Sequence, residues 1–221
     1  MKWNSRKSIA AILVAGATLT SGMVRAAQAP QKLVYSIHHS RYGTIGTYTN
    51  TVARNGNDTI VTTEIRIAVG FLGITLFRQE ASRQERWSGE RLVSFHGVTT
   101  TNGNAVELNG SAQGDHFVLN TPNGETVAPA NVRLANPWSP GFLGGNVLVT
   151  PDRGRLDEVR VSGGDAMSLS VAGRRVRAKR YDVFLLDGRK KYEIDLDEHG
   201  TPVQFVLFNP DGASVTFSLN G

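Results

Sequence analysis

Cysteine is absent from the 221 residues of this chain, and its absence excludes several kinds of protein. No disulfide can cross-link the fold, no thiolate can act as a nucleophile, and no lipid can be attached to an N-terminal cysteine. A chain of this length does not need covalent support, because it can bury a sizeable apolar core. We therefore expect a fold that is stabilised by its core.

Motifs for catalysis and metal binding are missing as well. The five histidines show no metal-ligand spacing with acidic partners, and the neighbours His38 and His39 would point to opposite faces of a strand. The acidic turn that contains Asp195 and Asp197 lacks the further acidic ligand of a calcium loop, and no G-x-S-x-G nucleophile motif occurs. The sequence thus predicts no catalytic residues, no metal site and no cofactor. It favours a protein that is not an enzyme but leaves that question open.

A strong charge of one sign is also lacking once the N-terminus is set aside. The whole chain has 24 basic and 19 acidic side chains, a formal net charge of +5. Lys2, Arg6, Lys7 and Arg25 belong to an N-terminal segment without acidic residues, and removing these 4 from the 24 leaves 20 basic side chains against 19 acidic ones. Nucleic-acid-binding domains need a marked basic excess. The sequence therefore argues against a nucleic-acid partner.

Residues 1–26 have the layout of a cleavable secretory signal peptide. Basic residues come first, an uncharged apolar stretch begins at Ile9, and the small residues Val24 and Ala26 precede the expected cut. An uncleaved membrane anchor is the alternative, but Gly, Thr and Ser interrupt the apolar stretch and leave it too short to span a bilayer. We expect residues 27–221 to form a single all-β domain in the periplasm or outside the cell, with no stable membrane span.

Helical patterns are scarce, and apolar residues instead alternate with polar ones. Val61, Ile65 and Val69 would share one face of a strand, with Glu64 and Arg66 on the other. Such alternation buries one face of a sheet and leaves the other in water. Pairs such as Asn-Gly and Asp-Gly separate the alternating runs, often at a spacing of ~10 residues. This pattern predicts antiparallel strands joined by hairpins.

The number of expected strands also bears on the shape of the sheet. A large antiparallel meander twists, so it closes into a barrel, curls into a half-barrel or splits into a sandwich. Because consecutive strands are joined by hairpins throughout, we expect a barrel or a clam-like half-barrel. The proline-rich connection at 128–145 interrupts the strand pattern, and we expect at most one short helix there.

Aromatic side chains supply the main candidates for ligand binding. If they line the concave face of a curved sheet, they could hold an apolar or lipid-like ligand. The competing interpretation is a dry core, in which the same side chains contact only one another. The candidate ligand-binding residues are Trp87, Phe95, Trp138, Phe142 and Tyr192, and Tyr181 belongs to the same aromatic set.

The densest run of charge lies at 174–180. In a strand, Arg175, Arg177 and Lys179 would project to one side, with Val176 and Ala178 on the other. One interpretation is a patch that binds anionic headgroups or phosphates. The other, which we favour, is a solvated strand face that is paired across to acidic residues of the next strand.

Several turn and strand segments resemble those of exported bacterial families of unknown function. They are Y-G-T-I-G at 42–46, E-R-W-S-G-E-R-L-V-S-F at 85–95, V-T-P-D-R-G-R-L at 149–156 and D-E-H-G-T-P-V at 197–203. The chain departs from the pattern at residues 192–195, which read Y-E-I-D where an aromatic-rich W-Y-D is expected. These families are similar in architecture to periplasmic lipoprotein carriers, whose curved antiparallel sheet clasps acyl chains. The resemblance implies a fold and an export compartment, and it carries over no catalytic residues.

Together these features favour a non-catalytic periplasmic protein that holds an apolar small molecule or a lipid in a curved β-sheet. A structural or interaction module of the cell envelope, with a protein partner that the sequence does not identify, is the alternative.

Overall fold

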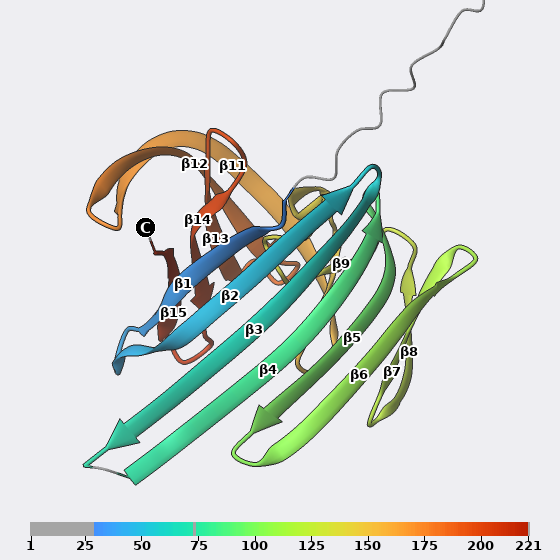
Figure 1. The fold of residues 1–221 in the computed structure, drawn as a ribbon, viewed down its shortest axis with the longest axis horizontal. Helices are drawn as coiled ribbons and strands as arrows, with labels where there is room; N and C mark the ends of the chain where they lie inside the picture. The colour runs from blue at the N-terminus through green and yellow to red at the C-terminus, as the bar shows by residue number, and fades with distance from the viewer. Residues whose placement is uncertain (1–28, 73, 221) are drawn as a thin grey trace, which may run out of the picture.

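The computed structural model describes residues 29–72 and 74–220, which form one curved β-sheet (Figure 1). The predicted signal peptide at 1–26 lies outside the described residues. Within the described part of the chain, no helix is long and apolar enough to cross a bilayer.

The first part of the sheet is a meander of long strands joined by tight turns. Its strands are β1 (Gln31–His39), β2 (Gly43–Asn55), β3 (Asp58–Phe71), β4 (Ile74–Ser88), β5 (Arg91–Thr101), β6 (Asn104–Gln113), β7 (His116–Thr121) and β8 (Gly124–Pro129).

The second part begins with short elements and ends in a further meander. Its elements are β9 (Arg133–Leu134), the 3-10 helix η1 (Phe142–Gly144), β10 (Val147–Val149), β11 (Leu156–Val171), β12 (Arg174–Leu185), β13 (Lys190–Asp197), β14 (Pro202–Phe208) and β15 (Ser214–Leu219). The single turn of η1 agrees with the short helix expected in the 128–145 connection.

The fifteen strands lie in the order β8-β7-β6-β5-β4-β3-β2-β1-β15-β14-β13-β12-β11-β10-β9. Neighbours are antiparallel except β9 and β10, which are parallel. Strands β1 and β15 pair in the middle of the sheet, while β8 and β9 are its edges and are not joined by a ladder within the described residues. The predicted all-β antiparallel sheet is therefore confirmed, and it curls into a half-barrel that hydrogen bonds do not close.

Strand β3 shows why the alternating sequence produces this sheet. Val61, Thr63 and Ile65 are buried on the concave face, whereas Glu64 and Arg66 are exposed on the convex face. Burial of every second side chain is the main source of stability for such a strand. The sheet must curl because these buried faces need a common interior.

The connection between β8 and β11 fills part of that interior. Val132 and Leu134 pack in an apolar cluster with Trp87 and Phe95 under β2–β8. Trp138 and other residues of the same connection pack in a second cluster under β1–β3 and β11–β15. The chain thus supplies its own filling for the half-barrel, but only part of the space is taken.

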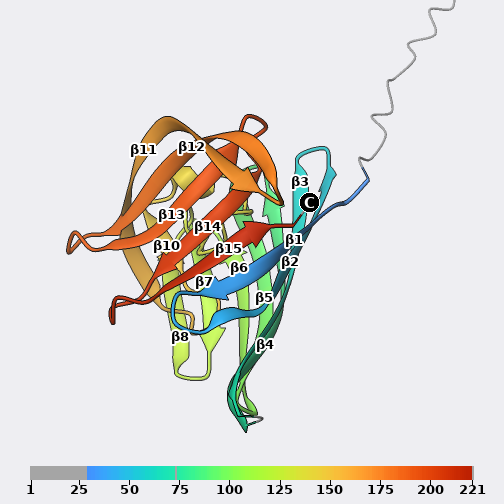
Figure 2. The ribbon, with the colours of Figure 1, turned by 90° about the vertical axis from the view of Figure 1, so that its left-hand side faces the viewer.

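Two hairpins extend beyond the body of the sheet, at opposite ends (Figure 2). The β3–β4 hairpin carries the exposed apolar residues Leu72, Ile74 and Leu76 near its tip. The β11–β12 hairpin curls over the other end of the sheet. Gly163 and Gly164, both with positive φ, lie at a register shift where β11 bends, and a Cβ at Gly163 would lie only 2.6 Å from the carbonyl oxygen of Arg180.

Candidate functional site

A cavity of about 1120 Å³ lies between the concave face of the sheet and residues 135–155. Strands β2–β4 line one side of it and β13–β15 the other, and the turns after β1, β12 and β14 surround its outer end. Its volume is slightly above the ~300–1,000 Å³ that is usual for sites holding small organic ligands. The half-barrel therefore contains space that its own side chains do not fill.

Aromatic rings form the apolar side of the cavity, which we call the aromatic wall. Tyr48 stacks on Trp138 with ring centroids 4.8 Å apart and planes at 28°. Phe205 continues the wall, 5.2 Å from Tyr192 and 5.3 Å from Phe217 between centroids. Rings in mutual contact are held rigidly and offer a large apolar surface to a ligand.

Hydrogen bonds fix the position of the wall. The Nε1 of Trp138 donates to the Tyr35 hydroxyl at 2.5 Å, and that hydroxyl donates to the Pro202 carbonyl at 2.7 Å. The Tyr48 hydroxyl donates to Oδ1 of Asn136 at 3.2 Å. Burial raises the pKa of Tyr48 to about 12 and also raises the pKa of Tyr35. Both hydroxyls therefore stay protonated and remain donors at neutral pH.

Polar side chains form one row across the concave face of the sheet beside the cavity, which we call the polar ladder. Asn50, Thr63, Arg83 and Gly97 are direct cross-strand neighbours on β2, β3, β4 and β5. The Thr63 hydroxyl donates to Oδ1 of Asn50 at 2.6 Å, and Nη2 of Arg83 donates to the Thr99 hydroxyl at 3.3 Å. The ladder brings a guanidinium group to the cavity, which Arg83 lines.

Glu85 lies next to Arg83 on the same face of β4. It joins the sheet to the connection between β8 and β11 (residues 130–155), which we call the inner segment. Its side chain is buried and accepts hydrogen bonds from Nε1 of Trp87, Nδ2 of Asn136 and Oγ of Ser139. Burial raises the pKa of Glu85, and the three donors and the charge of Arg83 oppose that shift. Because the carboxylate of Glu85 is bound by three donors at once, it holds Asn136 in place and with it Trp138, whose backbone N–H donates to Asn136.

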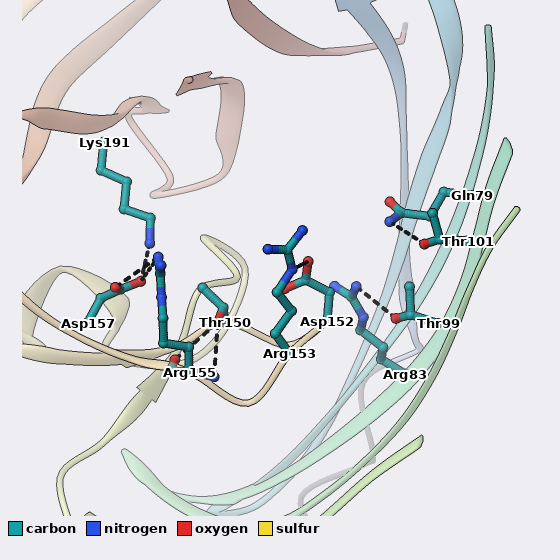
Figure 3. Close-up of polar contacts among 10 residues, drawn as sticks. All are labelled: Gln79, Arg83, Thr99, Thr101, Thr150, Asp152, Arg153, Arg155, Asp157 and Lys191. Atoms are coloured by element: carbon teal, nitrogen blue, oxygen red, sulfur yellow. Dashed lines mark hydrogen bonds and ion pairs between the residues drawn. The ribbon is translucent and has the colours of Figure 1, made fainter. Parts of the chain in front are cut away.

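Charged side chains surround the remaining side of the cavity (Figure 3). Arg155 and Lys191 both pair with Asp157, and Asp152 and Arg153 lie between that group and Arg83. The cavity lining holds six Lys and Arg side chains and a single carboxylate, that of Asp152. Most of these cations pair with carboxylates, such as Arg155 and Lys191 with Asp157 and Lys190 with Asp182. A site with an apolar wall beside such ion pairs suits a ligand with an apolar part and a polar or charged group.

Residues 35–220 match the model of the family described as Domain of unknown function (DUF6134). The chain belongs to this family. No curated protein matches the chain. The family description carries no activity, so the function of this DUF6134 domain has to be argued from its geometry.

In the DUF6134 domain, only some of the aromatic residues that the sequence suggested for ligand binding line the cavity. Trp138 and Tyr192 line the cavity, and Phe142 is buried in the same apolar cluster without lining it. Trp87 and Phe95 lie in the other cluster and do not reach the cavity. Tyr181, on β12, is half-buried and lies outside the cavity lining.

The basic run of β12 lies far from the cavity, on the β11–β12 hairpin. Arg175, Arg177 and Lys179 are exposed, while Val176 and Ala178 pack on the other face with Val203. Within the described residues these three cations form no ion pair with a carboxylate. The partner that reaches the acids of β13 is Arg180, whose Nε and Nη2 donate to Asp195 at 2.8 Å each.

Sequence analysis did not single out Arg83, the central polar residue of the site. A signal was present, because Ala81 is the only apolar residue between Arg78 and Arg86 on either face of β4. A strand with one buried face should place apolar residues at every second position, and Gln79, Arg83 and Glu85 break that rule on the inner face. Among residues 29–72 and 74–220, no three His, Asp or Glu side chains are grouped to hold a metal ion.

Proposed function

We propose that this domain is an exported, non-catalytic binding protein that holds a lipid-like ligand in the cavity of its half-barrel. The observation that carries the proposal is the open cavity of about 1120 Å³ with an aromatic wall. An apolar concave surface with a few polar groups is the usual form of a site for a small organic ligand. A ligand with a flexible apolar chain would cover it.

The architecture supports the same function. The inner segment positions Trp138 by hydrogen bonds to Asn136 and Tyr35, so the wall is formed before a ligand binds. A preformed wall lowers the entropy that binding costs. The expected signal peptide at 1–26 and the similarity in architecture to periplasmic lipoprotein carriers support a role in moving or storing such a ligand outside the cytoplasm.

Binding is tested by native mass spectrometry and lipid extraction of the purified protein. We expect a co-purifying ligand with an apolar chain, and we expect Ala135→Trp, which fills the cavity, to lose it. Ala53→Trp, on the convex face of β2, is the matched control and should keep the ligand. A wild-type protein that carries no ligand and takes up none from added lipid would overturn the proposal.

Export is tested separately with the full-length chain in a bacterial host. The processed protein should be recovered from the periplasmic fraction or the medium with Ala27 as its first residue. Recovery of the unprocessed chain in the cytoplasm would contradict the export part of the proposal and leave the binding part standing.

A second candidate function is an interaction module of the cell envelope whose β11–β12 hairpin docks on anionic headgroups, the ligand class that the sequence suggests for Arg175, Arg177 and Lys179. Arg175, Arg177 and Lys179 favour it, because they project from one face without a carboxylate partner among the described residues. Arg175→Glu with Arg177→Glu should abolish binding to vesicles of anionic lipid. Lys32→Glu with Arg54→Glu, which changes two exposed cations elsewhere, should not. Equal vesicle binding by both double variants would remove the hairpin from consideration.

A further inference from the structure

Arg83 has hydrogen-bonding capacity that the fold does not use. A guanidinium group carries five N–H donors. Its Nη2 contacts Thr99, but its Nε is buried without a hydrogen-bond partner in the described part of the chain. On the same ladder, Nδ2 of Asn50 is also buried and unpaired there. Buried donors in folded proteins are nearly always satisfied. Of these two residues only Arg83 lines the cavity, so its guanidinium group is the one that a ligand there can reach.

Arg83 also differs from the other cations of the cavity in its charge balance. Arg153 lies 3.5 Å from Asp152, and Arg155 lies 3.1 Å from Asp157, between nitrogen and oxygen atoms. No described carboxylate forms an ion pair with Arg83. The charges of Asp152 and Glu85 act on Arg83 from beyond ion-pair distance, and an anionic ligand at the guanidinium group would supply a direct counter-charge.

We propose that the cavity binds an amphipathic ligand with one anionic headgroup, a carboxylate or a phosphate, which pairs with Arg83. The inference rests on the proposed function, since it adds a headgroup to the lipid-like ligand. The planar fork of a guanidinium group matches the geometry of both headgroups and can bind either of them with two hydrogen bonds. The Tyr48 hydroxyl lies beside the ladder and keeps its proton, so it remains neutral next to an anion.

The position of Arg83 also determines which end of the cavity the headgroup and the apolar chain of the ligand would occupy. Moving along the inner face of β4 from Arg83 toward the β3–β4 tip, the cavity is lined by Gln79 and then by Phe77. On β3, Ile65, Ile67 and Val69 line it in the same direction. The headgroup therefore lies at the inner end, and the apolar chain runs outward along the apolar strands toward the exposed hairpin tip.

Isothermal titration with four probes tests the inference: decanoate, decyl phosphate, uncharged decanol and inorganic phosphate. We expect the wild-type protein to bind decanoate and decyl phosphate about 10- to 100-fold more tightly than decanol, as for a charge-assisted hydrogen bond. Arg83→Gln should reduce that preference to within about twofold and leave decanol binding unchanged. Arg83→Lys should keep part of the preference, which separates loss of charge from loss of fold.

Arg78→Gln is the matched control, because Arg78 lies on the exposed face of the same strand. It should leave all four affinities unchanged. Equal wild-type affinity for decanol and decanoate would refute the anionic headgroup but not the proposal of a lipid-like ligand. If none of the three ten-carbon probes binds, both proposals are refuted. Inorganic phosphate that binds as tightly as decyl phosphate, and only with Arg83 present, would support the anion site and overturn the lipid-like ligand.

Discussion

Glu85 connects the sheet to the inner segment through a buried carboxylate. Its three hydrogen bonds to Trp87, Asn136 and Ser139 join residues that lie up to 54 positions apart in the chain. Burial raises the pKa of this carboxyl group, and its three hydrogen-bond donors oppose the shift. Its effect on stability must therefore depend on pH.

Glu85→Gln should change that dependence in a defined direction. A raised pKa means that the folded state holds the proton more tightly than the unfolded state, so this contribution to stability is fully present at low pH and is lost as pH rises through the folded pKa. The free energy of unfolding of the wild-type protein relative to Glu85→Gln should thus fall with rising pH, by at most about 1.4 kcal/mol per pH unit. Urea unfolding from pH 4 to pH 8 measures the difference, and Glu125→Gln, at an exposed site that forms no ion pair among the described residues, is the control.

Gly97 leaves space for the aliphatic part of the Arg83 side chain. A Cβ at this position would lie 2.8 Å from Cζ of Phe95 and 3.2 Å from Cγ of Arg83. Because both side chains are held by the sheet, Gly97→Ala should lower the free energy of unfolding by about 1–2 kcal/mol. Gly144→Ala, where an added Cβ would meet no atom within 4 Å, should change it by less than about 0.5 kcal/mol. Equal values from chemical denaturation of the two variants would contradict this account.

At the scale of elements, register decides which residue of the basic run is paired. The sequence places Arg180 next to Lys179, but the ladder between β12 and β13 puts Arg180 opposite Asp195 and Lys179 opposite Leu196. Asp195 is buried, and Arg180 binds it with both Nε and Nη2. Arg180 therefore anchors the hairpin to the sheet, while its neighbours remain in solvent.

Arg180→Met should destabilise the protein by about 2–3 kcal/mol, because it leaves the buried Asp195 without its partner. The value is below that of a fully buried pair, since solvent screens the part of Arg180 that is exposed. Lys179→Met, which changes an exposed neighbour in the same way, should cost less than about 0.5 kcal/mol. Urea denaturation of both variants tests the register, and similar losses would show that Arg180 has no special role.

For the whole molecule, the arrangement of strands leaves the interior incompletely filled. The pairing of β1 with β15 places the two meanders side by side, and the open edges at β8 and β9 let the sheet curl around its own connection. The result is a dry cluster under β2–β8 and a hollow one beside β13–β15. A ligand that fills the hollow should stabilise the entire fold.

Calorimetry should detect that stabilisation. A ligand at about 100 times its Kd adds about 2.7 kcal/mol to the free energy of unfolding, which for a domain of this size is a rise in Tm of roughly 5–10 °C. Decanoate should produce this shift in the wild-type protein, and Ala135→Trp should reduce it sharply. An unchanged Tm at saturating decanoate would argue that the cavity does not take such a chain.

The sequence predicted the fold class well and the site only in part. Alternation at residues such as Val61 and Ile65 is a local property, so it could be read without coordinates. Trp138 and Tyr192, which the sequence suggested for ligand binding, lie in one apolar cluster, whereas Trp87 lies in another because β2–β8 carry their own core. Arg83 was missed, because the polar run of β4 does not tell which of its residues lines a cavity until the cross-strand neighbours are known.

By itself the sequence determined that this chain forms an antiparallel all-β sheet, since period-two burial and turn residues act over a few positions. Only the tertiary structure decided where the sheet opens, which aromatic rings line a cavity and which cation lies unpaired within it. Those features depend on contacts between residues that are far apart in the chain, such as Tyr35 with Trp138 and Glu85 with Ser139. Such contacts follow from register and curvature, which no local pattern specifies.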